Sequence, residues 1–221
     1  PRVCSISGAI DLFLQKKDAF YQNKAYFSDE PTVHLLPHWN HRGLEGEPIK
    51  VFAYTSCEEV ELILNGKTVS HDRVERYTHA EWQVPYEPGV LECVGYIGGK
   101  RAAYDCVKTS GKAVALKLHL DNAGDITANG EDIAMITCTC VDENGVEVPN
   151  AAPTVSFNCN TLGSVVGTGS DNTDHVPVTS TVRKMYAGAI GVAVKVGKEH
   201  GELKVFAESD GLDSAVIKFD I

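Results

Sequence analysis

The sequence has no long uninterrupted apolar run, and this argues against a helix that crosses a membrane. The longest nearly apolar stretch, residues 187–196, is about ten residues long and includes Lys195, whereas a transmembrane helix needs about 20. Basic residues are also scarce, because 20 Lys and Arg stand against 30 Asp and Glu, for a net charge of −10. An acidic surface repels phosphate and anionic lipid, so neither nucleic acid nor a membrane is an expected partner.

Several signatures of catalytic and metal sites are missing as well. The sequence contains no Cys-x-x-Cys, no Gly-x-Ser-x-Gly and no Gly-Lys-Ser/Thr phosphate loop. Its seven cysteines are an odd number, so we expect mostly buried thiols rather than a complete disulfide framework. Glycoside hydrolysis needs a pair of carboxyl groups, and nothing in the pattern of the acidic residues singles one out. The residues alone therefore predict neither a cofactor nor an active site.

The N-terminus shows no charged segment followed by an apolar one. The chain begins at Pro1, and its first methionine is Met135. We therefore expect no signal peptide and interpret the sequence as a piece of a longer polypeptide.

The pattern of apolar residues predicts a short helix followed almost entirely by strands. Helical spacing is confined to about Lys17–Tyr26. From Val33 to about residue 109 the pattern predicts about six short strands, with a tight hairpin at Asn65-Gly66. In the hairpin closed by Gly98-Gly99, a two-residue turn would place Cys93 opposite Tyr104.

A polar break at residues 109–112 separates a second series of strands. These are expected near 113–120, 132–141, 154–158, 164–167, 180–186, 189–196, 202–208 and 214–220. Two runs of short strands with turns between them are typical of two immunoglobulin-like antiparallel β-sandwiches in tandem. The predicted fold class is therefore all-β, with a partly helical segment at the N-terminus. We expect proteases to cut at the polar break.

One segment stands out as a candidate binding site. His34, His38 and His41 lie within eight residues and could ligate a metal, although Pro37 breaks any helix that would align them. His38, Trp39 and Asn40 could instead contact a sugar, with the indole stacked on the ring. Structural packing of Trp39 at a domain junction is the interpretation we favour.

A second candidate is the glycine-rich loop 167–175. Asp171, Asn172 and Asp174 could hold a cation such as Ca²⁺ through oxygen ligands. The spacing is not that of an EF-hand, and such residues commonly bond to their own backbone in turns. We expect no metal here.

Several segments resemble the C-terminal portion of bacterial β-galactosidases of glycoside hydrolase family two. They are Asp11-Leu-Phe, Lys17-Asp18 with Phe20-Tyr21, the run Val33–Asn40 with Gly43 and Glu45-Gly46, and the run Tyr54–Lys67. Trp82–Gly89 and Ala128–Ala134 also match. The likeness extends over nearly the whole chain, with departures at Lys16, where proline is usual, and at His41, where an aromatic residue is common.

The resemblance implies a layout and a function. Residues 1–30 would be the remnant of the end of the catalytic barrel, 31–109 the β-sandwich after it, and 113–221 a C-terminal immunoglobulin-like sandwich. The barrel's catalytic glutamates would lie upstream, so this region would be non-catalytic and would support the barrel, the rim of the sugar site or oligomer contacts. The alternative is a stand-alone carbohydrate-binding or adhesin-like module.

The expected partners follow from the same likeness. They are the upstream barrel of the same polypeptide, a carbohydrate and a second copy of the chain. Bacterial enzymes of this kind occur in both cytoplasm and periplasm.

Overall fold

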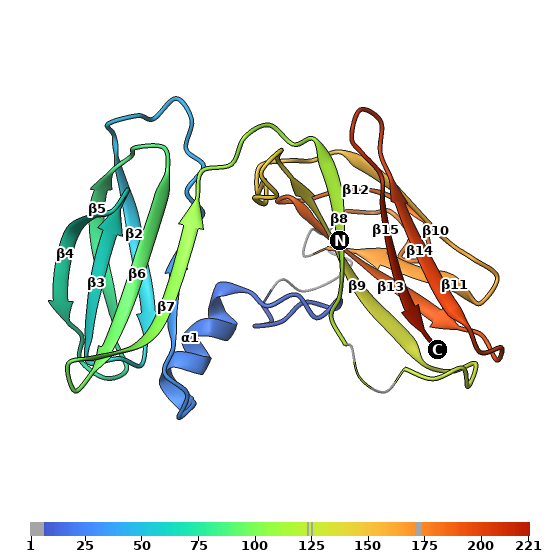
Figure 1. The fold of residues 1–221 in the computed structure, drawn as a ribbon, viewed down its shortest axis with the longest axis horizontal. Coiled ribbons are helices and arrows are strands. Elements are labelled where there is room, and N and C mark those ends of the chain that lie inside the picture. The colour runs from blue at the N-terminus through green and yellow to red at the C-terminus, as the bar shows by residue number, and fades with distance from the viewer. Residues whose placement is uncertain (1–6, 123, 125, 171–173) are drawn as a thin grey trace. The chain divides into compact units, whose positions relative to one another are not determined.

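The computed structural model describes residues 7–122, 124, 126–170 and 174–221. The chain forms two compact units. Lys16–Thr109 forms one, here called the helix-bearing unit, and Pro1–Gln15 with Ser110–Ile221 forms the other, here called the C-terminal unit. The described residues hold one α-helix and fifteen β-strands (Figure 1), which confirms the all-β class.

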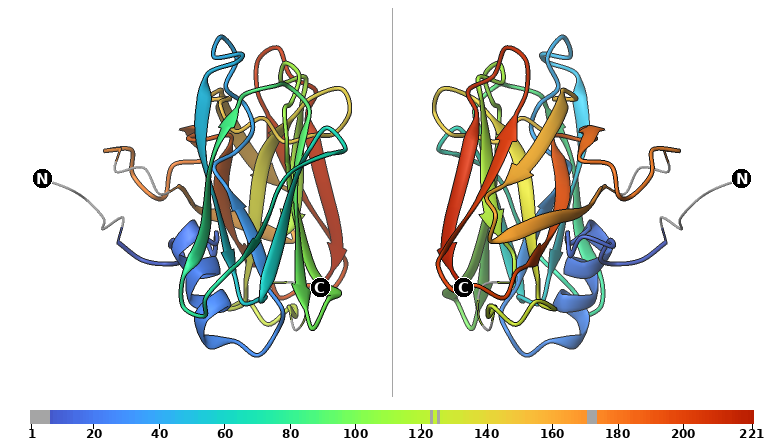
Figure 2. Two further views of the ribbon diagram at one scale, coloured as in Figure 1. Left: turned by 90° about the vertical axis from the view of Figure 1, so that its left-hand side faces the viewer. Right: turned by 90° about the vertical axis from the view of Figure 1, so that its right-hand side faces the viewer.

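The helix-bearing unit is a sandwich of two antiparallel sheets, with strand orders β1-β2-β5 and β4-β3-β6-β7. Helix α1 packs beside β1 and β2 (Figure 1, Figure 2). The core of the helix-bearing unit contains every second residue of β3, namely Val60, Leu62 and Leu64. These side chains share one face, because side chains alternate between the two faces of a strand. The elements are α1 (Asp18–Phe27), β1 (Val33–Leu36), β2 (Pro48–Thr55), β3 (Glu59–Leu64), β4 (Lys67–Arg73), β5 (His79–Pro85), β6 (Val90–Ile97) and β7 (Lys100–Lys108).

The C-terminal unit is a second antiparallel sandwich, with strand orders β11-β13-β9-β8 and β12-β10-β14-β15. Alternate residues of β13, namely Ile190, Val192 and Val194, face its core. The strands are β8 (Ala115–Leu120), β9 (Ile133–Val141), β10 (Thr154–Cys159), β11 (Gly163–Gly169), β12 (Val182–Lys184), β13 (Ala189–Val196), β14 (Glu202–Glu208) and β15 (Ala215–Asp220).

The local expectations are mostly confirmed. Helix α1 lies within one residue of the predicted helix at each end, and all eight predicted strands of the second series are present. In the hairpin between β3 and β4, Asn65 and Gly66 have φ values of 50° and 77°. The first series has seven strands where about six were expected, and β4, which completes the hairpin at Asn65-Gly66, has the weakest pattern. It is an edge strand with mostly exposed polar residues, so it carries little apolar alternation.

The predicted register of the β6–β7 hairpin is wrong. Tyr96 pairs with Arg101 as a two-residue turn requires, but an irregularity between Gly95 and Tyr96 shifts every earlier pair by one residue. Cys93 consequently lies opposite Asp105 instead of Tyr104. Paired residues share a face of the sheet, so this one-residue shift places Cys93 and Cys106 on opposite faces. Cys93 is buried, whereas Cys106 is only partly buried.

The polar break between the two strand series is ordered where it enters the C-terminal unit. Ser110 is 1% exposed. The amide of Gly111 donates to Asp142 Oδ2 at 2.6 Å, and the Asp142 carboxylate also accepts the amides of Asn144 and Val146. These bonds hold the pKa of Asp142 below its usual value, with the Gly111 amide the largest cause. These hydrogen bonds attach Gly111 to the turn that contains Asp142, within the C-terminal unit.

Candidate functional site

Trp39 is a core residue of the helix-bearing unit. Its side chain is 0% exposed, and its Nε1 donates to the carbonyl of Glu87 at 2.8 Å. The ring meets Tyr86 edge-on, with 5.1 Å between centroids. Thr109 Oγ1 donates to the Trp39 carbonyl at 2.6 Å. The indole thus ties the segment after β1 to the loop between β5 and β6, while the backbone carbonyl of Trp39 is tied to the residue that follows β7, and neither face of the indole is open to a sugar ring.

The neighbours of Trp39 form a small cluster at the surface. His38 is exposed and its ring stacks on that of His41, with 5.0 Å between centroids. Asn40 is buried, and its backbone amide donates to His38 Nδ1 at 3.2 Å. Partial desolvation by the surrounding protein atoms, and then the neighbouring His41, lower the pKa of His38, although its side chain is exposed. His34 makes its own contacts elsewhere, and within the described residues no group of three His, Cys, Asp or Glu could hold a metal ion. The three histidines of this segment therefore do not converge.

His34 joins α1 to the sandwich. Its Nε2 lies 3.0 Å from Asp18 Oδ1 on the helix, and its Nδ1 lies 3.4 Å from Asp105 Oδ2 on β7. Asp105 is held in turn by the Leu35 amide at 2.8 Å. Burial alone lowers the pKa of His34, but the hydrogen bonds to Asp105 and Asp18 outweigh it, so the pKa lies above 6.5. The cation form of His34 thus bridges two carboxylates.

Phe13 anchors the segment before α1 to the C-terminal unit. The phenyl ring is 7% exposed and lies on Gly169 of β11 and Gly191 of β13, which are paired across the sheet. A Cβ atom on either glycine would overlap with the Phe13 side chain. We call these two residues the glycine seat. Because any side chain on them would displace Phe13, the outer face of this sheet is shaped for the segment that lies on it.

A tight turn presents Phe13 to the glycine seat. Asp11 Oδ1 accepts the amides of Phe13 at 2.8 Å and Gln15 at 2.9 Å, and the Asp11 amide donates to the Gln15 carbonyl. The flanking residues Leu12 and Leu14 remain exposed, Leu12 at 76%. Apolar side chains on both sides of an anchored residue are available to a further surface.

Asp174, at one end of the loop considered as a cation candidate, contacts an arginine. Arg183 of β12 is buried and forms an ion pair with Asp174. It also donates to Thr168 Oγ1 at 3.2 Å and to the carbonyls of Val176 and Pro177. Asp174 therefore already has a cationic partner, while Asp171 and Asn172 lie outside the described residues.

Most of the cysteines that the structure describes are buried, and Cys4 lies outside the described residues. Cys57, Cys93, Cys138 and Cys140 are buried free thiols, as expected, and Cys106 and Cys159 are partly exposed. Burial raises the pKa of Cys93 and of Cys138 to about 12. A thiol with such a pKa is protonated near neutral pH and is a weak nucleophile.

The sequence pattern missed three of these features. The Phe13 contact depends on the pairing of two glycines that lie 22 positions apart in the sequence. The His34 bridge depends on residues from three elements. The sequence places Arg183 in a strand but does not indicate its ion pair with Asp174. The one local signal is Gly-x-Gly in β11, which leaves a strand face without side chains. No helix in the described part of the chain is long and apolar enough to span a bilayer.

Two family profiles match the sequence. Residues 116–218 match glycoside hydrolase family 2 C-terminal domain 5, and residues 46–103 match a domain of unknown function, DUF4982. The first match covers nearly all of the second sandwich, and the other lies within the first.

Curated relatives and solved structures agree with these matches. The chain is 31% identical over 225 residues to the beta-galactosidase BoGH2A of Bacteroides ovatus, an alignment that covers 99% of this chain and 26% of that protein. It is 29% identical over 213 residues to a beta-glucuronidase of Formosa agariphila, covering 95% of this chain and 21% of that protein. A crystal structure of a beta-glycosidase from Bacteroides vulgatus superposes with a TM-score of 0.91 at 28% identity, covering 97% of this chain and 28% of that one.

These matches define the class of protein. The chain belongs to the C-terminal regions of glycoside hydrolase family 2. It spans about a quarter of the length of the curated relatives named above.

Proposed function

We propose that this chain is the non-catalytic C-terminal accessory region of a β-galactosidase-type glycoside hydrolase. Its relatives are glycoside hydrolases in which the matching region is a minor part of the protein. In this proposal the nucleophile and the acid/base lie in the upstream catalytic barrel, and the two sandwiches support that barrel. Residues 1–30 are the end of the barrel, 31–109 the first sandwich and 113–221 the second.

The contact between Phe13 and the glycine seat carries this proposal. The segment that resembles the end of the barrel is fastened to the last sandwich, because Phe13 is buried on Gly169 and Gly191. The exposed Leu12 and Leu14 flank this anchor and would meet the rest of the barrel. Burying such side chains stabilises an interface by about 1.5–3 kcal/mol each.

The segment containing His38, Trp39 and Asn40 has a packing role in this proposal. Trp39 is enclosed by Tyr86, Glu87 and Thr109, so it holds together the sandwich that follows the barrel. His38 lies beside Trp39 at the surface, and Asn40 is buried next to it.

The test is made in the parent polypeptide. Gly191→Val fills the glycine seat, so it should lower the melting temperature of the parent while the KM for a chromogenic β-galactoside changes less than about twofold, because no substrate contact is touched. Lys195→Val is the matched control, since this exposed residue lies on the same face of β13. An unchanged melting temperature in Gly191→Val, or a large rise in KM at unchanged stability, would contradict the supporting role.

A further inference from the structure

A groove lies on the outer face of the C-terminal unit, over the neighbouring strands β10 and β14 (Figure 1). Its volume is about 440 Å³, within the range of binding sites for small groups. Its lining consists of Ser156, Phe157 and Asn158 of β10, Phe206 and Glu208 of β14, and Thr181. Thr181 closes one side of the groove, because its carbonyl accepts the Phe157 amide at 2.8 Å.

The strand register places an aromatic ring and a carboxylate next to each other in this groove. Phe206 and Glu208 are two residues apart on β14, so their side chains share the outer face. On β10, Asn158 lies opposite Phe206, and Ser156 lies opposite Glu208. Opposite residues of paired strands have Cβ atoms about 5 Å apart. The groove therefore combines one apolar ring with one carboxylate and neutral polar groups.

Glu208 has no cationic partner within the described part of the chain. Two lysines of the same sheet, Lys204 and Lys218, lie instead 3.2 and 3.9 Å from Glu202 Oε1, toward the other end of β14. The Phe206 ring is 37% exposed, and the face of an aromatic ring attracts cations. The net charge of −10 adds a long-range attraction for positive groups. The groove is thus complementary to a cation with a flat apolar surface.

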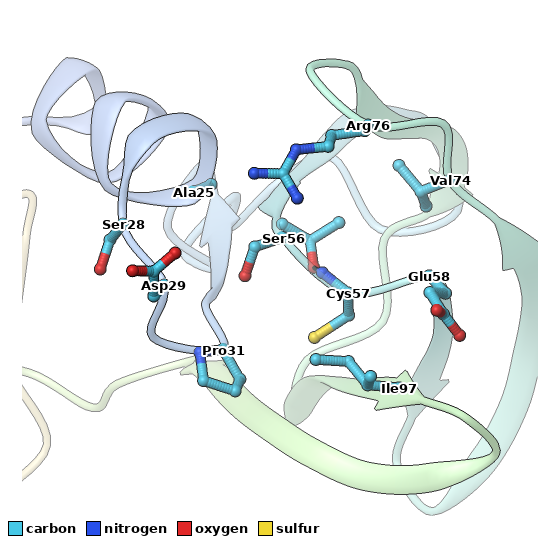
Figure 3. A pocket seen from close by; sticks show the side chains of 11 residues that line it. Ala25, Ser28, Asp29, Pro31, Ser56, Cys57, Glu58, Val74, Arg76 and Ile97 are labelled. Atoms are coloured by element: carbon cyan, nitrogen blue, oxygen red, sulfur yellow. Dashed lines mark hydrogen bonds between the residues drawn. The ribbon is translucent and has the colours of Figure 1, made fainter.

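The cavity beside the end of α1, in the helix-bearing unit, has no such preference. It has a volume of about 400 Å³, and Figure 3 shows the Arg76 guanidinium and the carboxylates of Asp29 and Glu58 among its lining side chains. Charges of both signs make this cavity complementary to neither cations nor anions. Among the described residues that line the groove on β10 and β14, by contrast, Glu208 alone is charged.

We infer that this groove docks an arginine side chain from a basic segment of a partner protein. The planar guanidinium stacks on the Phe206 ring and donates to the Glu208 carboxylate. Its other N–H groups donate to the hydroxyl oxygens of Thr181 and Ser156. Ser156 Oγ donates to the Glu208 carbonyl at 3.4 Å, so its oxygen remains available as an acceptor. A lysine ammonium fits less well, because it is neither planar nor a forked donor.

This inference does not depend on the accessory role proposed above, because docking at the groove needs neither the barrel nor hydrolysis. Loss of the accessory role would leave the groove and its charge unchanged, and failure of docking would leave the contact between Phe13 and the glycine seat unchanged.

The test measures peptide binding to the whole 221-residue chain. Amide NMR spectra are recorded at low salt while the peptide acetyl-Ala-Arg-Ala-amide is added. The signals of Asn158, Phe206 and Glu208 should shift with a dissociation constant in the millimolar range, as expected for one ion pair and one cation–π contact. The same peptide with neutral citrulline in place of arginine should bind at least about threefold more weakly, because the ion pair is lost.

Variants of the groove should change the affinity in a defined order. Glu208→Gln should weaken the arginine peptide about three- to fivefold, and Phe206→Leu about twofold or more. Glu202→Gln is the matched control, because it removes a carboxylate from the same face of the same strand but outside the groove. It should leave the affinity unchanged. Melting curves of every variant show that the chain is folded when binding is measured.

Several results would overturn the inference. They are equal binding of the arginine and citrulline peptides, tighter binding of the corresponding lysine peptide, unchanged binding in Glu208→Gln, and shifts confined to residues outside the groove. Sedimentation of the chain alone tests a second copy as the occupant. Self-association that Glu208→Gln abolishes would assign the groove to a contact between copies and would also overturn docking of a basic partner.

Discussion

The imidazole of His34 lies parallel to the phenol ring of Tyr21, with 3.9 Å between the ring centroids and 14° between the planes. Tyr21 belongs to α1 and His34 to β1, so this stack is the point where the helix rests on the sandwich. Asp18 and Asp105 bond to the two nitrogens of the same imidazole. One side chain thus combines an aromatic contact with two charge-assisted hydrogen bonds.

The His34 bridge should make the stability of the helix-bearing unit depend on pH. Because the folded pKa lies above the usual 6.5, the stabilisation is fully present below about pH 6.5 and is lost as the pH rises through the folded pKa. Both tryptophans, Trp39 and Trp82, lie in this unit, so tryptophan fluorescence in urea reports on its unfolding. His34→Gln should flatten the pH profile, whereas the exposed His119 can be replaced by Gln without effect. An equally steep profile in His34→Gln would exclude the bridge as its cause.

Phe13→Ala should destabilise the C-terminal unit by about 1.5–3 kcal/mol, the value of one buried phenylalanine side chain. Leu12→Ala is the control, because an exposed side chain usually changes stability by about 0.5 kcal/mol or less. Urea unfolding followed by circular dichroism should detect the loss for Phe13→Ala. The tryptophan transition should stay in place, because no tryptophan lies in this unit. Equal stabilities of the two variants would mean that Phe13 does not anchor the segment.

Trp39→Ala should lower the free energy of unfolding by about 3–5 kcal/mol, because removing an aromatic ring from the closed core also leaves a cavity. Trp39→Phe should recover part of that loss, since it keeps the ring but removes the bond from Nε1 to the Glu87 carbonyl. The remaining Trp82 serves as the fluorescent reporter in urea unfolding. A variant as stable as the original chain would contradict the role of Trp39 in the core.

The buried thiols should be slow to alkylate. With pKa values of about 12, Cys93 and Cys138 are almost fully protonated at pH 8, whereas the partly exposed Cys106 and Cys159 are accessible to reagent. Brief iodoacetamide treatment followed by peptide mass spectrometry should label Cys106 and Cys159 before Cys93 and Cys138, and all thiols should react in denaturant. Labelling of Cys138 at the rate of Cys106 in the folded chain would contradict the burial described above.

The sequence predicted what local pattern determines and missed what depends on distant pairing. Alternation in β3 and β13 and the turn at Asn65-Gly66 identify the strands directly, because burial on one face and φ above zero leave a local trace. The irregularity between Gly95 and Tyr96 leaves no such trace in the sequence, so the predicted pairing partner of Cys93 was wrong. The glycine seat depends on the pairing of Gly169 with Gly191, which only the completed sheet brings about.

The proposed accessory role implies that this chain has no hydrolytic activity of its own. The decisive measurement is release of the chromophore when the purified 221-residue chain is incubated with chromogenic β-galactoside and β-glucuronide. We expect no release above the rate without protein, and release by the parent polypeptide that includes the proposed barrel. Turnover by the chain that disappears when one of its own glutamates is replaced by glutamine would overturn the proposed role.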